Sequence, residues 1–319
     1  MELKEIKKDI YACLQADKGF GWNNAGFVNL GGGLAIDTFH DLNLTRQMIE
    51  LYKTITDKPI RRLVNTHHNG DHTWGNQLFK GSEIIAHRLC AEELKKDKIR
   101  DLPDVFDGMK KYPEYLSSGL KHFAEHLSEF EYSDIEIKLP NHLIDDKLEL
   151  DLEGYPCHLI YVGPAHSPGD LIVYLPEDDV IFAGDIVFTD CHPICWEGTH
   201  SKWIEALDLI LSFNPEIIVP GHGPLCDVDK VKDLRDYFEY IYSEAKKFFD
   251  DDLDPLEASK KIDIGPYLKY SGPERLYFFV HRAYREFKNV ELWNARLNST
   301  ELFNKSYELW LYWNENGII

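Results

Sequence analysis

Apolar and polar residues alternate along this chain in a way that predicts strands and helices packed in layers. Four short apolar runs have the length and composition of buried strands, at residues 62–66, 158–162, 179–183 and 216–219. Nearer the start, the apolar runs 25–30 and 34–37 flank Gly31-Gly32-Gly33, which is typical of two strands joined by a tight turn. Residues 41–55 then carry apolar side chains at helical spacing. Strand, helix and strand in this order favour an α/β fold.

Two further parts of the chain show helical spacing without strand signals. The first, about 88–132, carries spaced aromatic residues and predicts a helical insertion that could form a wall of a substrate pocket. The second follows residue 222 and predicts four helical stretches, at residues 227–249, 259–268, 273–287 and 300–313. Their apolar faces are expected to pack on the body of the protein or on a second subunit.

Histidine and aspartate residues follow the four predicted strands. Three come after the first strand and one after each of the others: His67, Asp71 and His72, then His166, Asp185 and His222. A rigid sheet can direct such imidazole and carboxylate groups to one shared point when the strand ends lie on one edge. Any one of these residues alone would be an ordinary buried or loop residue. The set as a whole predicts a metal site.

Two other pairs have spacings that can suit a metal. His122 and His126 lie four residues apart on one face of a predicted helix, but no third ligand is near them in the sequence, which favours a solvated helix face. Cys191 and Cys195 could bind structural zinc, but no second matching pair is present. We therefore interpret the cysteine segment as a loop that lines a pocket.

Composition and charge narrow the classes of function. A chain of 319 residues with 44% hydrophobic residues can bury a large core. The formal net charge of −20 opposes binding to nucleic acid, since a phosphate backbone would be repelled at long range. The first residues are charged and no later stretch is apolar enough to cross a bilayer, so we expect a cytoplasmic protein without membrane contact. In that compartment the six cysteines are expected to be free thiols.

Five segments together resemble the metallo-β-lactamase superfamily over about residues 25–227. The family motif His-x-His-x-Asp-His corresponds to residues 67–72, with Asn69 at the position of the second histidine. The other segments occur in the family's order, at Asn24-Ala25-Gly26, Ala165-His166-Ser167-Pro168-Gly169-Asp170, Phe182-Ala183-Gly184-Asp185 and Val219-Pro220-Gly221-His222-Gly223. The resemblance implies an α/β fold, a four-layer αβ/βα sandwich with a helical insertion and a helical C-terminal extension. It divides the chain into a domain at 1–227 and the extension at 228–319.

The resemblance also implies a ligand set for one or two metal ions at the sheet edge, usually zinc and sometimes iron or manganese. His67 and His166 would bind the first ion, Asp185 would bridge both, and the second ion would take Asp71, His72 and His222. Asn69 offers the first ion a neutral amide oxygen, which suits manganese or magnesium better than zinc. The first site is therefore expected to bind more weakly or to prefer a different ion. Asn69 would ligate, hold a metal-bound water or leave that site empty.

Two cations sharing a carboxylate predict hydrolysis by a metal-bound hydroxide. The expected substrate is a small organic ester, lactone, thioester, amide or sulfate ester, and Asp71 is the expected catalytic residue, placed to orient the water or pass a proton. Residues that follow the ligand segments are expected to line the substrate pocket: Trp74, Phe188, Cys191, His192, Trp196 and His200.

Two other functions stay open at the level of sequence. Two histidines and a carboxylate with open positions can also support oxygen or redox chemistry on iron. Alternatively, Asn69 would have ended catalysis, and the chain would be a metal-binding or structural protein on the same scaffold. The C-terminal helices could then serve as the interface of a homodimer.

Overall fold

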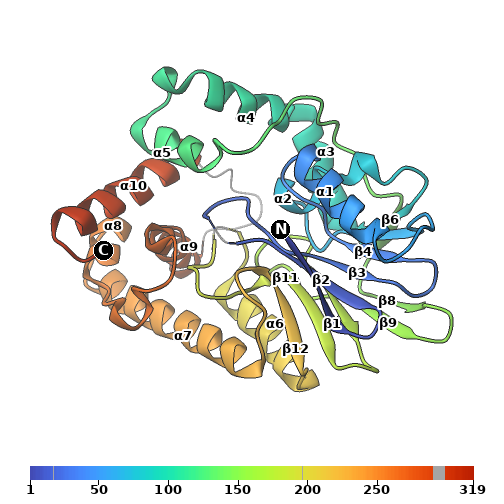
Figure 1. Cartoon of the computed structure of the whole chain (residues 1–319). Coiled ribbons are helices and arrows are strands. Elements are labelled where there is room, and N and C mark those ends of the chain that lie inside the picture. Colours follow the sequence, from blue (N-terminus) through green and yellow to red (C-terminus); the bar gives the residue numbers. More distant parts are fainter. Residues whose placement is uncertain (17, 196, 290–298) are drawn as a thin grey trace.

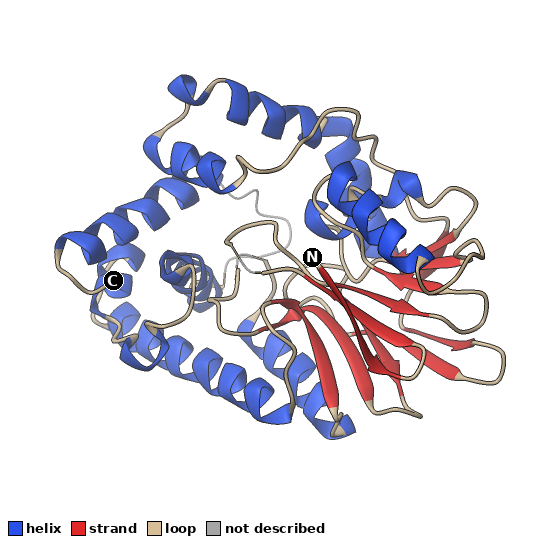
Figure 2. Ribbon diagram, in the orientation of Figure 1, coloured by secondary structure: helices blue, strands red, loops and turns tan. Residues whose placement is uncertain are grey.

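Two β-sheets lie face to face, with helices packed against their outer faces (Figures 1 and 2). This computed structural model describes residues 1–16, 18–195, 197–289 and 299–319. The first sheet has seven strands in chain order: β1 (Glu2–Lys7), β2 (Ile10–Leu14), β3 (Ala25–Val28), β4 (Leu34–Ile36), β5 (Arg62–Val64), β6 (Glu83–His87) and β7 (His142–Ile144). The second has five: β12 (Ile217–His222), β11 (Val180–Phe188), β10 (Leu171–Leu175), β9 (Pro156–Tyr161) and β8 (Lys147–Asp151).

Strand directions follow from the connections. Strands β1 to β4 are antiparallel neighbours, whereas β4 to β7 run parallel and are linked by helical segments. In the second sheet only β11 and β12 are parallel. The predicted hairpin is confirmed as β3 and β4, with Gly31, Gly32 and Gly33 all at positive φ in the turn. The pair β1 and β2 was not predicted: β1 is an exposed edge strand whose alternation is masked by lysine and glutamate, and β2 is a short apolar run beside it.

Successive side chains of a strand point to opposite faces of its sheet, so each strand contacts two layers. In β4, Leu34 and Ile36 point between the sheets, while Ala35 faces the helix side. In β11, Val180 and Phe182 point between the sheets and Ile181 faces the opposite layer of helices. This arrangement is helix, sheet, sheet, helix, which is the four-layer sandwich that the sequence predicted.

The first helix layer contains α1 (Leu42–Lys53), as the spacing at 41–55 predicted. Asp41 begins it by accepting a hydrogen bond from the backbone N–H of Leu44. Met48 and Tyr52 of α1 are fully buried against the sheet, and the Tyr52 hydroxyl donates to the Gly26 carbonyl across 3.0 Å. On the other side, α6 (His200–Phe213) packs on β11 through the buried Trp203, whose ring nitrogen donates to the Ile186 carbonyl.

The predicted insertion is helical but is broken in the middle. Its elements are α3 (Arg88–Arg100), α4 (Leu102–Lys111), the 3-10 turn η2 (Pro113–Tyr115) and α5 (Ser118–His126). Pro113 separates α4 from η2 within the predicted insertion, because proline has no N–H to continue the hydrogen-bond ladder. Figure 1 shows α4 and α5 as a separate layer, away from the sheets and above the C-terminal helices.

The C-terminal region is helical over most of its length. Its elements are α7 (Val228–Asp250), α8 (Pro255–Lys261), the 3-10 turns η3 (Gly265–Tyr267) and η4 (Pro273–Arg275), α9 (Leu276–Phe287) and α10 (Ser299–Glu315). The helical stretch predicted at 259–268 is divided in the structure: its first residues end α8, which begins earlier, and residues 265–267 form η3. Asp254 caps α8 by accepting from the backbone N–H of Leu256, and Pro255 occupies its first turn.

One close contact joins the insertion to the C-terminal region. Helix α5 lies against α10, where a side chain at Gly119 would come within 2.3 Å of the Phe303 carbonyl oxygen. The Gly119 N–H also donates to the Asn304 side chain at 2.9 Å. Glycine is needed here because two backbones touch. Across the described residues, none of the helices has the length and apolar character needed to span a membrane.

Candidate metal centre

Seven candidate ligands lie where the two sheets meet. His67 follows β5, Asn69 precedes the short helix α2 (Gly70–Thr73), and Asp71 and His72 lie within α2. His166 lies in the loop between β9 and β10, Asp185 in β11, and His222 at the end of β12. The edges are tied together at this point, because the Leu171 N–H donates to the Thr66 carbonyl at 2.7 Å.

Asp185 occupies a different local structure from the one expected. The sequence placed it in a loop after a strand ending near Ala183, but β11 continues to Phe188. The pairing of β11 with β12 shifts register around Gly184, which has φ of 52°. Such a bulge re-aims the following side chain. The carboxylate of Asp185 therefore enters the site from within a strand.

Gly221 makes room for that carboxylate. A Cβ atom at position 221 would lie 2.1 Å from Oδ1 of Asp185, a separation that no pair of non-bonded atoms tolerates. The Pro220-Gly221-His222 segment thus needs glycine for close approach and not only for turn geometry.

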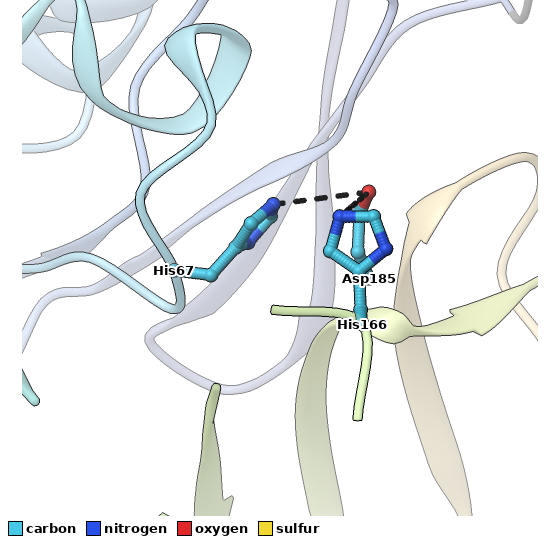
Figure 3. Close-up of side chains that lie close together, drawn as sticks. All are labelled: His67, His166 and Asp185. Carbon is cyan, nitrogen blue, oxygen red and sulfur yellow. Dashed lines mark ion pairs between the residues drawn. The ribbon is translucent and has the colours of Figure 1, made fainter. Parts of the chain in front are cut away.

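The first group of donors consists of His67, His166 and Asp185. Oδ2 of Asp185 lies 3.9 Å from Nε2 of His67 and 3.5 Å from Nε2 of His166. Figure 3 shows both rings turned toward the carboxylate from separate segments. All three side chains are at most 4% exposed.

The second group consists of Asp71, His72 and His222, and it shares the same carboxylate. Oδ2 of Asp71 is 3.8 Å from Nε2 of His72 and 3.5 Å from Nε2 of His222. Asp185 reaches both rings, with Oδ1 3.1 Å from Nε2 of His72 and Oδ2 3.3 Å from Nε2 of His222. Asp185 is therefore placed between the two groups. His68 belongs to neither of them.

Each of the four imidazoles is held through its other nitrogen. Nδ1 of His72 is 2.9 Å from the Asp37 carboxylate, and Nδ1 of His222 is 3.0 Å from the Trp22 carbonyl. Nδ1 of His166 is 3.1 Å from the Ile194 carbonyl. These acceptors require a proton on Nδ1 and leave the lone pair of Nε2 facing the site.

His67 follows the same rule through a hydroxyl. Thr66 donates its hydroxyl proton to Asp37 at 2.7 Å, so its oxygen accepts from Nδ1 of His67 at 3.1 Å. Nε2 of His67, Nε2 of His72 and Oδ1 of Asp185 are buried with no hydrogen-bond partner. Several acceptor atoms thus face one another, which is unfavourable without a cation.

The spacing of these atoms suits ligands of shared metal ions. Two ligands on one tetrahedral zinc, each at 2.0–2.1 Å, stand about 3.3 Å apart. The distances of 3.1 to 3.9 Å between imidazole nitrogens and carboxylate oxygens are close to that value. The residues present therefore fit one or two divalent ions.

Asn69 directs its amide toward the first group. Its Oδ1 lies 3.1 Å from Nε2 of His166, a spacing typical of two ligands on one ion. Because Nε2 of His166 carries a lone pair when Nδ1 bonds to the Ile194 carbonyl, an amide oxygen beside it needs a cation between them or a rotated amide.

Burial and charge act in opposite directions on the ionisable groups. Burial lowers the pKa of His72, but Asp185, Asp37 and Asp71 outweigh it and raise the pKa well above its usual value. Burial would raise the pKa of Asp185, yet the surrounding imidazoles hold it well below the usual range. For His67, burial and the neighbouring His72 together lower the pKa well below normal. The second group therefore attracts positive charge more strongly than the first.

Of the predicted pocket residues, Phe188 lies against a ligand, and Trp74 directly follows the short helix that carries Asp71 and His72. The Phe188 ring stacks on His222 with ring centroids 5.2 Å apart and 5° between the planes. Trp74 follows α2, is 2% exposed, and has an indole N–H without a hydrogen-bond partner. Both are closely packed beside the metal centre.

The other predicted pocket residues are directed elsewhere or not described. His192 is fully buried, with Nδ1 2.9 Å from the Tyr237 hydroxyl of α7. His200 stacks on Tyr242 of α7 at 3.9 Å between ring centroids. Cys191 is buried, and Trp196 lies outside the described residues. His192 and His200 thus contact the C-terminal helices rather than the ligand groups.

Several residues of the site were missed from the sequence. Asp37, with φ of 60°, orients both His72 and Thr66, although it was noted only as part of a strand end. His40, two residues after Thr38, is buried among Trp74 and Tyr132, with ring centroids 4.9 and 5.6 Å away. Burial lowers the pKa of His40 to about 4, which keeps the ring neutral near Asp71. A histidine directly after a predicted strand was the available signal.

Comparison with known proteins identifies the family to which the chain belongs. A model of the metallo-beta-lactamase superfamily matches residues 23–222. A linear primary-alkylsulfatase of Pseudomonas sp. (strain ATCC 19151) is 24% identical over 266 residues, which are 74% of this chain and 49% of the relative. The chain spans about half the length of the curated relatives it matches.

Solved structures share the fold to different extents. A stereoselective inverting sec-alkylsulfatase from Pseudomonas sp. aligns over 92% of this chain and 51% of its own, with a TM-score of 0.67 and 16% identity. A metallo-beta-lactamase from Pontibacter korlensis aligns over 75% of this chain and 98% of its own, with a TM-score of 0.55 and 16% identity. With the family model covering well over half of its length, the chain belongs to the metallo-beta-lactamase superfamily.

Proposed function

We propose that the chain is a metal-dependent hydrolase that acts on a small organic substrate, with zinc as the first ion to test. The observation that carries this proposal is the common orientation of four imidazoles. Each has Nδ1 bonded to an oxygen and Nε2 turned toward Asp185 or Asp71. Ordinary packing would not require the same tautomer at four histidines.

Bound divalent ions would supply Lewis acidity and a water acidic enough to act as a nucleophile near neutral pH. The chain's own residues hold that chemistry in place. Asp185 contacts both groups and fixes their separation. Asp71 is the most accessible of the carboxylates, with 13% of its side chain exposed against 4% for Asp185. That exposure leaves Asp71 able to orient the attacking water or to pass a proton to a leaving group.

Buried aromatic side chains would exclude bulk water from this reaction. Phe188 covers one face of His222, and Trp203 lies 5.7 Å from His166, edge to face. Electrostatic interactions strengthen where water is excluded. Aromatic walls also favour a substrate with apolar surface.

Sulfate esters are the first substrate class to test among the ester, lactone, thioester and amide classes. The sec-alkylsulfatase aligns with 92% of this chain, whereas the Pontibacter korlensis metallo-beta-lactamase aligns with 75%. The larger overlap includes helical parts that lie outside residues 23–222. These parts are expected to shape substrate selection, which supports a start with primary and secondary alkyl sulfates.

The test uses the full chain stripped by a chelator and reloaded with zinc, manganese or iron(II). Turnover is measured on alkyl sulfates, an aryl ester, a lactone, a thioester and a β-lactam. We expect hydrolysis of at least one class that disappears on chelation and returns with metal, and that the Asp185→Ala variant lacks. Absence of metal-dependent turnover on every class would favour a scaffold without catalysis.

If the chain is instead an iron-dependent redox enzyme, its metal content and its response to zinc would differ. Protein purified without added metal would then contain iron, absorb visible light and consume oxygen when a substrate is oxidised. Zinc reloading would not restore that activity.

A further inference from the structure

A second group of metal-binding side chains lies far from the sheet edge, on α5 and η4. His122 and His126 occupy one face of α5, and their sequence neighbourhood offers no third ligand. The fold supplies one, because Glu274 of η4 comes beside them although it is about 150 residues away in the chain. One donor atom from each residue lies within 4.8 Å of the other two.

The two imidazoles differ in how their nitrogens are partnered. Nδ1 of His122 is 3.8 Å from the Glu125 carboxylate, while its Nε2 is buried and has no hydrogen-bond partner. Nδ1 of His126 faces the backbone at Gly19, and the ring bonds to the Lys18 carbonyl. An imidazole nitrogen that is buried without a partner also occurs at the sheet-edge centre, at His67 and His72.

The carboxylate of Glu274 is buried without a protein cation. Glu274 is 5% exposed, and no hydrogen bond or ion pair involves its carboxylate within the described parts of the chain. The adjacent Arg275 is directed elsewhere, with its guanidinium 4.6 Å from the Phe20 ring and a hydrogen bond to the His192 carbonyl. A buried carboxylate is costly unless a positive charge or hydrogen bonds compensate for it.

We propose that His122, His126 and Glu274 bind a divalent transition-metal ion, and that this ion links the helical insertion to the C-terminal region. Two imidazoles and one carboxylate form a ligand set that zinc uses, with water in the fourth position. The donors now lie within 4.8 Å of one another, and two ligands on one zinc stand about 3.3 Å apart, so binding would require small rotations of the side chains. Zinc is preferred over magnesium or calcium, because two of the three ligands are nitrogen.

The surrounding contacts give the ion a structural role. His122 lies 4.9 Å from the Tyr307 ring and 5.1 Å from the Trp310 ring of α10. The Glu274 carbonyl accepts a hydrogen bond from Ser306 of α10. A bound ion would therefore connect α5 to η4 beside α10, and it would stabilise the folded state more as its concentration rises above its Kd.

The test counts zinc per chain in the full-length protein after equilibrium dialysis. We expect His122→Gln and Glu274→Gln each to bind one zinc fewer than the unmodified chain. Zinc at the sheet edge, read from metal-dependent hydrolysis or from the Asp185→Ala difference in zinc content, should stay unchanged. The rise in melting temperature on adding zinc should shrink in both variants.

His142→Gln is the matched control. His142 also pairs with a carboxylate, Glu83 at 2.8 Å, but it belongs to no group of three donors. Its zinc content should equal that of the unmodified chain. Equal zinc content in His122→Gln and the unmodified chain would overturn the proposal. If Glu274→Gln does not fold, the His122 position, whose side chain is 21% exposed, decides the question alone.

Discussion

The two halves of the sheet-edge centre share Asp185 but differ in charge. The second half combines Asp71, His72 and His222, and the Nδ1 of His72 is held by the Asp37 carboxylate. The first half combines His67 and His166 with the neutral amide of Asn69. Its imidazoles are held by a hydroxyl and a backbone carbonyl.

From this difference we expect the order of metal binding to depend on the supporting residues as well as on the ligands. A carboxylate behind an imidazole makes it a stronger donor and fixes its orientation. The second half has such support and a carboxylate ligand of its own. We therefore expect the second half to fill first and the first half to bind its ion more weakly.

Replacement of the shared carboxylate should have the largest effect, because it breaks both halves at once. For Asp185→Ala we expect loss of most bound metal at the sheet edge and a fall in any hydrolase activity by about a thousandfold or more. Metal analysis and steady-state kinetics measure the two quantities. The control is Asp190→Asn, an exposed neighbour paired with Lys230. Full turnover in Asp185→Ala would contradict the bridging role.

The Asp37→Asn variant should weaken metal binding in the second half more than in the first. The amide removes the charge behind His72, so we expect about 10- to 100-fold weaker binding of the second-half ion. The first half should change less, because His67 is reached only through the Thr66 hydroxyl. Competition with a chelator gives the two affinities. Glu83→Gln is the control, since it removes the carboxylate beside His142, a histidine outside both halves. An equal loss in both halves would show that Asp37 supports the whole centre.

The Asn69→His variant should bring the zinc affinity of the first half closer to that of the second. It restores an imidazole next to His166, so we expect about tenfold tighter zinc binding in the first half and a higher zinc content at limiting zinc. Titration with zinc and with manganese measures the change, and the preference for manganese should fall. An unchanged metal content would mean that Asn69 does not face the first ion.

The smallest expected effect concerns His40, a buried neutral histidine near the second half, and the pH dependence of stability. Its folded pKa of about 4 is below its unfolded value near 6.5, so on acidification the unfolded chain takes up a proton that the folded chain does not. Between pH 6.5 and 5.5 this removes about 1 kcal/mol from the free energy of unfolding, and above pH 7.5 it has no effect. His40→Gln should lack this loss. Urea unfolding of chelator-treated protein measures it, and identical pH profiles would exclude a buried neutral His40.

The local sequence pattern predicted those ligands that directly follow a single apolar strand. His67, His166 and His222 each follow an apolar run, and the structure brings them together around Asp185. The strand pattern could not show that β11 continues past Asp185, because the bulge at Gly184 depends on pairing with β12. Register between distant strands is a property of the folded sheet.

Residues whose roles depend on distant partners could not be assigned. Asp37 contacts His72, which is 35 positions away in the sequence. Glu274 lies beside the α5 histidines, although about 150 residues separate them in the chain. His192 and His200 follow ligand segments, yet α7 provides Tyr237 and Tyr242 as their partners. A histidine after a strand can face a pocket or a packed helix, and only the position of that helix decides between them.

The backbone contact at Gly119 bears on any attempt to redesign this protein. With α5 lying directly on α10, neither helix can change its path without moving the other. Grafting the insertion of a homologue into this chain would thus leave a steric mismatch with residues 303 and 304. A transplant that carries both helices together would keep their junction, so the two segments should be treated as one exchangeable module.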